Sequence, residues 1–201
     1  MTSPTSPDGR SPTLNRPRVR LAALPAACLL ALGGLLATEP PGRLPATLES
    51  PRLVVRKAKR QLLVYSGETL LKTYRVGLGG NPVPPKGRRG DLATPEGSYV
   101  VCIRNPRSQF LLSLGLSYPN AADADRGLSA GLVTRSQHRR IVESARTGAC
   151  PPWNTELGGE IFIHGRGSAT DWTWGCVALD DDDVRELYPR IPVGTPVVIE
   201  P

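Results

Sequence analysis

The most informative segment of the chain is Ile161-Phe-Ile-His-Gly-Arg-Gly-Ser-Ala-Thr-Asp-Trp-Thr-Trp-Gly-Cys-Val177. Its first three residues form an apolar run typical of a buried strand. That run delivers a histidine, His164, and a Gly-Cys pair ending at Cys176 then opens a second apolar run. The pattern predicts a β-rich region in which an imidazole and a thiol stand beside glycines.

These residue types suggest a thiol active site. A cysteine attacks as the thiolate, and a nearby imidazole lowers its pKa and can take its proton. Gly175 permits tight backbone geometry, so the amides of Gly175 and Cys176 are candidate oxyanion donors. The other nitrogen of His164 needs a partner, which is a backbone carbonyl near Gly165 or Arg166 or else a side chain. A structural histidine with a buried core thiol is the equally weighted alternative.

The 201 residues fit one domain plus a tail, with a formal charge of +7 and a pI near 9.6. The basic residues are spread over several clusters without a basic helix or interleaved aromatic residues, which excludes nucleic acid as the expected partner. The cluster Arg56–Arg60 is expected to form a solvated strand face. Attraction to an anionic wall polymer or to lipid headgroups is compatible with the charge.

The N-terminal part predicts export. Residues 1–20 form a basic n-region with a disordered composition, and residues 21–37 are uncharged and mostly apolar. This pattern is typical of a secretory signal peptide or an N-terminal membrane anchor; lipidation at Cys28 is a minor alternative. Residues 38–51 are proline-rich and predict a linker. The folded domain is therefore expected at residues 52–201, in the periplasm or cell envelope.

Export would place Cys102, Cys150 and Cys176 in an oxidising compartment. The odd number leaves at least one thiol free or paired externally. A Cys102–Cys150 disulfide would leave Cys176 free, and a buried, unpaired Cys102 is the alternative. No Cys-x-x-Cys or His-x-x-x-His spacing indicates zinc, so no metal is expected.

Hydrophobic runs predict a mainly β, α+β domain without βαβ alternation. Residues 77–97 form a long Gly/Pro-rich loop, which is typical of a functional or disordered segment. Acidic residues 180–183 favour a helix N-terminus capped by Asp180 over a metal site. The expected strands are 53–55, 61–65, 70–76, 98–104, 110–118, 159–164 and 194–199, and the expected helices are 121–128, 137–146 and 180–188.

These residues resemble the L,D-transpeptidase catalytic domain (YkuD-like) family. That family carries His-Gly at a strand end and then Ser/Thr-x-Gly-Cys, matched here by His164-Gly165 and Thr173-Trp174-Gly175-Cys176. The resemblance covers about Leu53 to Ile199. Its further matches are Val76–Gly79, Gly90–Tyr99, Ser117–Asn120 and Gly194–Ile199.

The resemblance implies a mixed-sheet or β-sandwich domain with short helices that acts on peptidoglycan stem peptides without metal or organic cofactor. Cys176 would attack the L-centre to D-centre amide, release D-Ala and form a thioester, with His164 as the base. An amine would then take the acyl group, which makes a cross-link or attaches an envelope protein. Gly165, Thr173 and Gly175 would position these groups.

The sequence departs from many members at one position, because Ala178 stands where they carry Arg. The residues Asp171-Trp172-Thr173 and Val177-Ala178-Leu179 are nearest a branch whose activities include hydrolysis of L,D bonds. Trp172, Trp174 and Arg166 are candidates for the cleft. Three functions therefore stay open: an L,D-transpeptidase, an L,D-carboxypeptidase or endopeptidase using the same site, and a non-catalytic wall-binding module.

Overall fold

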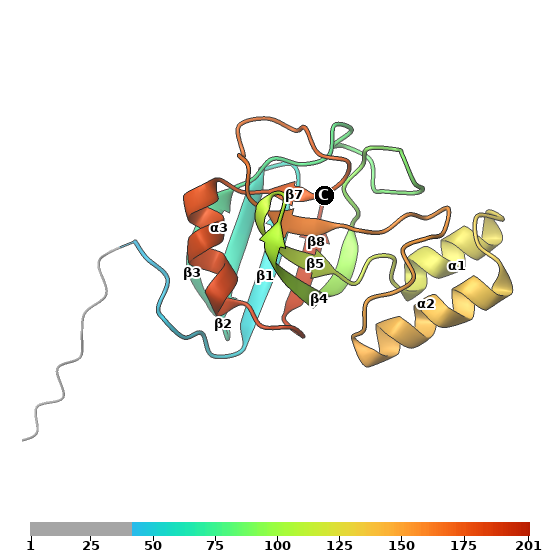
Figure 1. Cartoon of the computed structure of the whole chain (residues 1–201), viewed down its shortest axis with the longest axis horizontal. Helices are drawn as coiled ribbons and strands as arrows, with labels where there is room; N and C mark the ends of the chain where they lie inside the picture. Colours follow the sequence, from blue (N-terminus) through green and yellow to red (C-terminus); the bar gives the residue numbers. More distant parts are fainter. Residues whose placement is uncertain (1–41) are drawn as a thin grey trace, which may run out of the picture. The chain divides into compact units, whose positions relative to one another are not determined.

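The computed structural model describes residues 42–201, which form a sheet with three helices (Figure 1). The expected n-region and signal at residues 1–37 lie outside the described residues. The strands are β1 (Pro51–Arg56), β2 (Gln61–Ser66), β3 (Thr69–Arg75), β4 (Gly97–Ser108), β5 (Leu111–Leu116), β6 (Phe162–His164), β7 (Val177–Ala178) and β8 (Pro196–Glu200). The helices are α1 (Ala121–Ser129), α2 (Arg135–Thr147) and α3 (Asp181–Leu187), and a short 3₁₀ turn, η1 (Tyr188–Arg190), follows α3.

The eight strands lie in the order β3-β2-β1-β8-β4-β5-β6-β7. β1, β2 and β3 form the expected antiparallel meander. The last strand, β8, lies between β1, to which it is parallel, and β4, to which it is antiparallel. β4 continues into a second region of the sheet, where β5, β6 and β7 follow. The mainly β, α+β expectation is confirmed, with a mixed sheet.

The main core is aliphatic and draws on every strand and on α3. β1 contributes Leu53 and Val55, and α3 contributes Val184 and Leu187, all fully buried. Each such side chain stabilises the fold by roughly 1.5–3 kcal/mol relative to its exposed state. α3 packs against β5, the strand next to the histidine-bearing strand β6.

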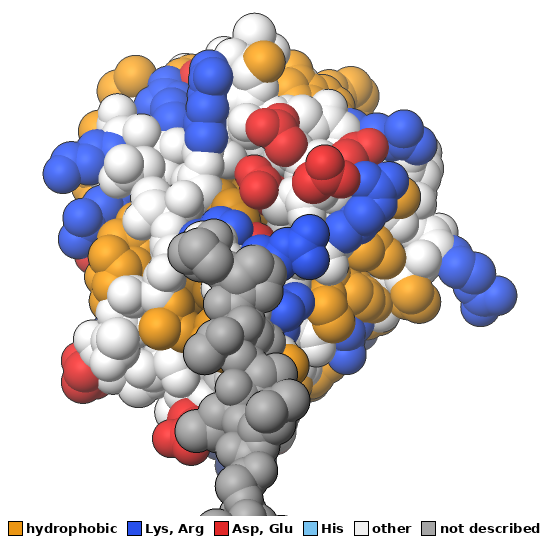
Figure 2. Space-filling view, turned by 90° about the vertical axis from the view of Figure 1, so that its left-hand side faces the viewer, with side chains coloured by type: hydrophobic (Ala, Val, Ile, Leu, Met, Phe, Trp, Pro, Cys, Tyr) orange, Lys and Arg blue, Asp and Glu red, His pale blue; other side chains and the backbone are white. Residues whose placement is uncertain are grey.

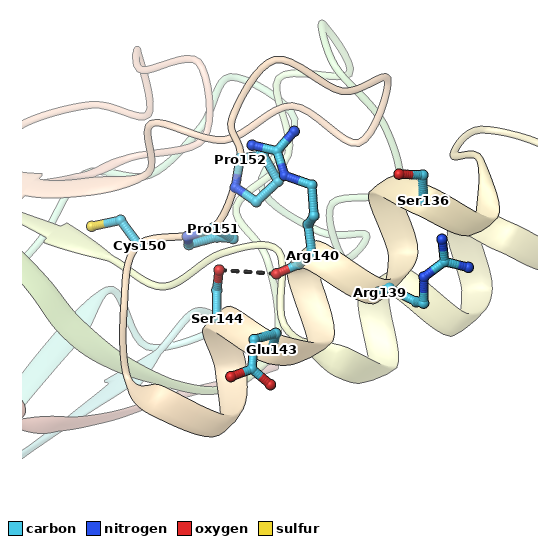
Figure 3. A pocket seen from close by; sticks show the side chains of 8 residues that line it. All are labelled: Ser136, Arg139, Arg140, Glu143, Ser144, Cys150, Pro151 and Pro152. Carbon is cyan, nitrogen blue, oxygen red and sulfur yellow. Dashed lines mark hydrogen bonds between the residues drawn. The ribbon is translucent and has the colours of Figure 1, made fainter.

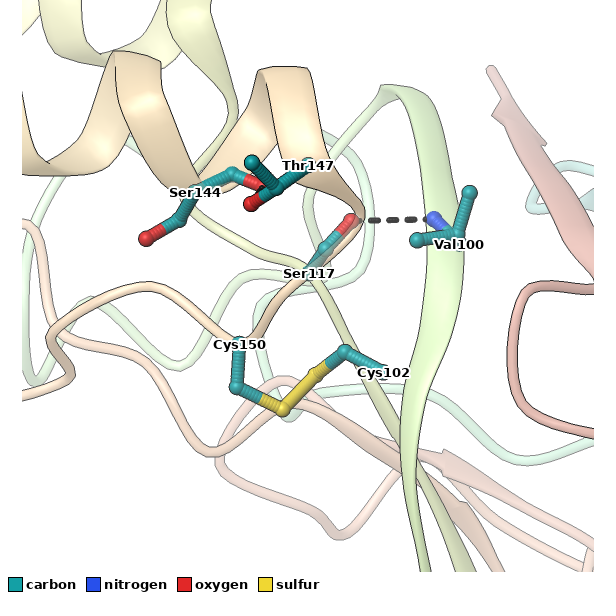
Figure 4. Close-up of a disulfide and its surroundings, with 6 residues drawn as sticks. All are labelled: Val100, Cys102, Ser117, Ser144, Thr147 and Cys150. Carbon is teal, nitrogen blue, oxygen red and sulfur yellow. Dashed lines mark hydrogen bonds between the residues drawn. A yellow bond between two sulfur atoms is a disulfide. The ribbon is translucent and has the colours of Figure 1, made fainter.

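α1 and α2 form a separate pair with a small core of their own, Ala124, Val133, Ile141 and Leu157. Both helices begin at a capping box, from Asn120 and from Thr134. A disulfide between Cys102 on β4 and Cys150, just after α2, ties this pair to the sheet (Figure 4). Cys176 is the free cysteine of the described residues.

Residues 42–50 have no regular secondary structure, yet they pack against the domain. Leu44 and Leu48 are buried in the main core, and the amide of Leu44 donates to Glu186 Oε1 at 2.8 Å. Arg190 donates to the carbonyl oxygens of Leu44 and Pro45. The folded body therefore begins before residue 52, within the segment that composition assigned to a linker.

One local expectation is wrong, and another is confirmed only in part. Lys57, expected on a solvated face, is only 1% exposed, because its ammonium donates to three loop carbonyls and to Glu96 Oε1 at 2.7 Å. Asp180 occupies the N-cap position of α3 without a capping bond. Its carboxylate instead accepts from the amide and hydroxyl of Ser168 at 2.8 and 3.1 Å.

Candidate active site

The candidate site lies where β6 and β7 run side by side. These short parallel strands pair Ile163 with Val177 and His164 with Ala178. His164 is the last residue of β6, and Cys176 directly precedes β7. The two apolar runs of the sequence therefore bring the imidazole and the thiol to neighbouring strand ends.

Two cavities meet at these residues, and both His164 and Cys176 line each of them. The first, of about 420 Å³, has polar side chains beside the rings of Phe110 and Phe162; the second, of about 370 Å³, is mainly aromatic. The first is also lined by Asn105, Ser108, Gln109, Phe110, Ser113, Glu160 and Phe162. The second is also lined by Gln109, Phe110, Trp172, Thr173 and Trp174.

His164 is held tightly and is 1% exposed. Its ring stacks on Phe110, with centroids 4.5 Å apart, and meets Trp172 edge-on at 5.7 Å. Nδ1 donates to the carbonyl oxygen of Gly165 at 2.7 Å, so the backbone is the partner that the sequence left open. Burial lowers the pKa of the imidazole, which leaves a neutral ring with a lone pair on Nε2.

Cys176 is partly exposed in the cavities. Its Sγ accepts from the amide of Phe162 at 3.4 Å and donates to the carbonyl oxygen of Glu160 at 3.5 Å. Burial raises the pKa of the thiol to about 11, and the Glu160 carboxylate acts in the same direction. The resting pair is therefore a neutral thiol and a neutral imidazole, which suits general-base activation during attack.

Thr173 fixes the turn that presents the thiol. Its Oγ1 donates to the carbonyl oxygen of Cys176 at 2.8 Å and accepts from the amide of Gly175 at 3.2 Å. Gly175 has φ of 120°, and a Cβ there would lie 2.6 Å from the carbonyl oxygen of Ala93. Because the Gly175 amide is engaged with Thr173, the Cys176 amide is the candidate oxyanion donor that the local hydrogen bonding leaves open.

The loop at residues 77–97 supports this turn from outside. Thr173 exchanges backbone hydrogen bonds with Leu78 and Gly80 at 3.1 and 3.0 Å. Asp171 accepts from the amide of Leu78 at 2.9 Å and from the guanidinium of Arg60 at 2.7–3.0 Å. The Asp residue of the Asp-Trp-Thr motif thus ties the meander, the long loop and the thiol turn together.

The other predicted site residues are Trp172, Trp174, Gly165 and Arg166. Trp172 packs on His164 and donates from Nε1 to the carbonyl oxygen of Gly167 at 3.1 Å, whereas Trp174 projects outward and is 81% exposed. Gly165 has no room for a side chain, since a Cβ would lie 2.8 Å from Asp181 Oδ1. Arg166 is exposed and lines neither cavity; its amide donates to Asp181 Oδ1 at 2.8 Å.

Sequence reasoning did not find Phe110 or Glu160. Phe110 lies 54 positions before His164 (164 − 110), in a turn between strands, and no local pattern indicated that it stacks on the imidazole. Glu160 lay inside a predicted strand, but its φ of 56° ends regular pairing, so β6 begins only at Phe162. A glycine pair directly before it, Gly158-Gly159, was the available signal for irregular backbone.

Other surface features are less suited to catalysis. A hollow of about 490 Å³ beside α2 contains Arg139 and Arg140, whose guanidinium groups point to different sides (Figure 3). On the face with α3 and β3, acidic and basic side chains lie close together (Figure 2). Among the described residues, no cluster of three His, Cys, Asp or Glu side chains could hold a metal ion. In this same part of the chain, no helix has the length and apolarity needed to cross a membrane.

Comparison with known proteins gives a consistent result. The family model YkuD, the L,D-transpeptidase catalytic domain, matches residues 50–199. The helical cell shape determining protein Pgp2 from Campylobacter jejuni has a similar structure, with a TM-score of 0.52 and 20% identity over 75% of this chain and 47% of that one. An L,D-transpeptidase from Mycobacterium smegmatis matches with a TM-score of 0.43 and 14% identity, over 76% and 59% of the two chains.

The chain therefore spans about half of the Pgp2 structure, and that likeness supports the fold alone. No curated protein sequence matches the chain.

Proposed function

Because the chain belongs to the YkuD family of L,D-transpeptidase catalytic domains, we propose that it is a cysteine enzyme acting on peptidoglycan stem peptides. Cys176 is the nucleophile and His164 is the base. The observation that carries this assignment is that both groups line the same two cavities while Nδ1 of His164 is committed to the Gly165 carbonyl. Nε2 is then the nitrogen left to take a proton.

In the first half-reaction, Sγ of Cys176 attacks the carbonyl carbon of the L-centre to D-centre amide and its proton passes to His164 Nε2. The C–N bond breaks, and the imidazolium returns the proton to the leaving D-Ala amine. In the second half-reaction an amine attacks the thioester, the C–S bond breaks, and the proton passes through Nε2 to the sulfur. The amide of Cys176 stabilises the oxyanion in both steps.

Hydrolysis of the same thioester is the second candidate. Cys176 is partly exposed, and Trp174, at 81% exposure, stands away from the core. Water can therefore reach the thioester unless bound substrate excludes it, and the enzyme would then act as an L,D-carboxypeptidase or endopeptidase. A wall-binding module without catalysis would need neither a thiol nor an imidazole in its cavity.

The test is incubation of the protein with purified disaccharide-tetrapeptide muropeptides, followed by mass spectrometry. A cross-linked product would identify the transferase, and a tripeptide without cross-link would identify the hydrolase. Cys176→Ala should abolish both products, with its circular dichroism and melting temperature close to those of the wild type. Wild-type turnover by a folded Cys176→Ala protein would refute the role of the thiol.

The proposed substrate also requires an envelope location. Residues 1–37 would direct export, residues 38–41 would lead into the folded body, and the catalytic domain would act outside the inner membrane. Fusion of residues 1–50 to a reporter that is active only after export tests this part. Retention of an inactive reporter in the cytoplasm would contradict both the signal and the wall substrate.

A further inference from the structure

We propose that Glu160 forms a cation subsite beside Cys176, which holds the ammonium group of the acyl acceptor. The proposal rests on the proposed function and adds a specificity-determining residue to it. The first support is position. Glu160 lines the first of the two cavities together with the thiol, and its own carbonyl oxygen lies 3.5 Å from Sγ of Cys176.

The second support is the absence of a competing charge in that cavity. Glu160 is the only Asp or Glu residue lining it, and no Lys or Arg is among the lining residues. Lys86 is a cation that acts on the thiol, but its ammonium is bonded to Asp91 Oδ1 at 2.8 Å and the residue is 4% exposed. The cavity therefore presents one negative charge and no positive one beside the nucleophile.

The third support is that the Glu160 side chain is exposed and has no partner within residues 42–201, so its carboxylate is accessible to a ligand. Other carboxylates around the site are occupied: Asp91 by Lys86, Glu96 by Lys57 and Asp171 by Arg60. Glu160 makes neither a salt bridge nor a side-chain hydrogen bond there, in a chain with 25 Lys and Arg residues. Its left-handed backbone, with φ of 56°, also interrupts strand pairing at this position.

In the second half-reaction the Glu160 carboxylate would bind the amine acceptor. A primary amine has a pKa near 10.4 and arrives as the ammonium ion at neutral pH. The Glu160 carboxylate would bind that ion next to the thioester, where the ion loses one proton to solvent. The free amine then attacks, and Nε2 of His164 accepts the second proton that the nitrogen releases. The N–C bond forms, the C–S bond breaks, and the sulfur receives the proton from the imidazolium. The uncharged aromatic cavity around Phe110, Trp172 and Trp174 is left for the donor.

The first experiment measures the subsite without any enzymatic reaction. Cys176 of the full-length protein is modified with cationic 2-aminoethyl methanethiosulfonate or with neutral methyl methanethiosulfonate, and the Cys176 peptide is quantified by mass spectrometry. In each case the sulfur of Cys176 forms a disulfide and methanesulfinate leaves. The ratio of the two rates cancels any change in the pKa of the thiol.

We expect the cationic-to-neutral rate ratio to fall about fivefold in Glu160→Gln and further in Glu160→Lys. The matched control is Glu68→Gln, which removes the same charge at a side chain that is 99% exposed and lines neither cavity. Its ratio should equal that of the wild type. Equal ratios in Glu160→Gln and wild type would overturn the subsite.

The second experiment identifies the source of the ammonium group. With a tetrapeptide donor, Glu160→Gln should raise the KM for ethylamine about fivefold. The KM for the donor, and that for uncharged hydroxylamine, should not change. A rise in the donor KM alone would assign the ammonium to the donor and overturn the acceptor role. Absence of any Cys176 thioester by mass spectrometry would refute the proposed function, whereas the modification ratio would still decide the subsite.

Discussion

The protonation state of the resting thiol is open to a direct measurement. Burial raises the pKa of Cys176 to about 11, against an ordinary value of about 9. At pH 7 the thiolate fraction is then about 10⁻⁴ in place of about 10⁻², so alkylation should be about a hundredfold slower than that of an ordinary cysteine. His164 does not offset this effect as a cation, because its burial keeps it neutral.

The assay is the rate of iodoacetamide labelling of the Cys176 peptide between pH 6 and pH 10. The rate should rise about tenfold for each pH unit and reach no plateau in this range. Glu160→Gln should shift the profile to lower pH, because the Glu160 carboxylate raises the pKa of the thiol. A plateau below pH 8 would reveal a thiolate–imidazolium pair and refute the neutral resting state.

Three further perturbations test the scaffold of the site. Thr173→Val removes a donor to the Cys176 carbonyl and an acceptor for the Gly175 amide, so kcat/KM should fall at least tenfold, while Thr173→Ser should retain most activity. Gly175→Ala forces a Cβ to 2.6 Å from the Ala93 carbonyl oxygen at a φ of 120°. Turnover should be lost, and urea unfolding should show that the free energy of unfolding falls by about 1–3 kcal/mol. The Cys102→Ser, Cys150→Ser double variant should lose about 4 kcal/mol of unfolding free energy, because the bridge closes a separation of 48 residues; an unchanged urea midpoint would contradict this.

The sequence was most informative where chemistry and local pattern coincide. An apolar run before His164 and a glycine before Cys176 predicted strand ends and a tight turn, and both are present. The meander β1–β3 was also readable, since each turn is local. By contrast, nothing local to β8 indicated that it would insert between β1 and β4, because pairing between distant segments depends on the whole sheet.

The missed features share a different cause. Lys57 looked like a surface residue, yet the backbone carbonyls of a loop about 30 residues away solvate its ammonium. Asp180 stands at the N-cap position of α3 as expected, yet its carboxylate binds Ser168. Asp181 accepts from the Arg166 amide in the turn after His164. Charge patterns along the chain identify these residues as polar, but only the fold selects their partners.

The cysteine arrangement has a consequence for biogenesis. Three cysteines of the described domain allow three single bridges, but only Cys102–Cys150 leaves Cys176 free. Either of the other pairings would consume Cys176, the proposed nucleophile, and the product would still contain one free thiol. Rearrangement can begin from that remaining thiol, through a mixed disulfide. Maturation should therefore depend on disulfide isomerisation as well as oxidation, and the yield of titratable Cys176 would report correctly folded molecules.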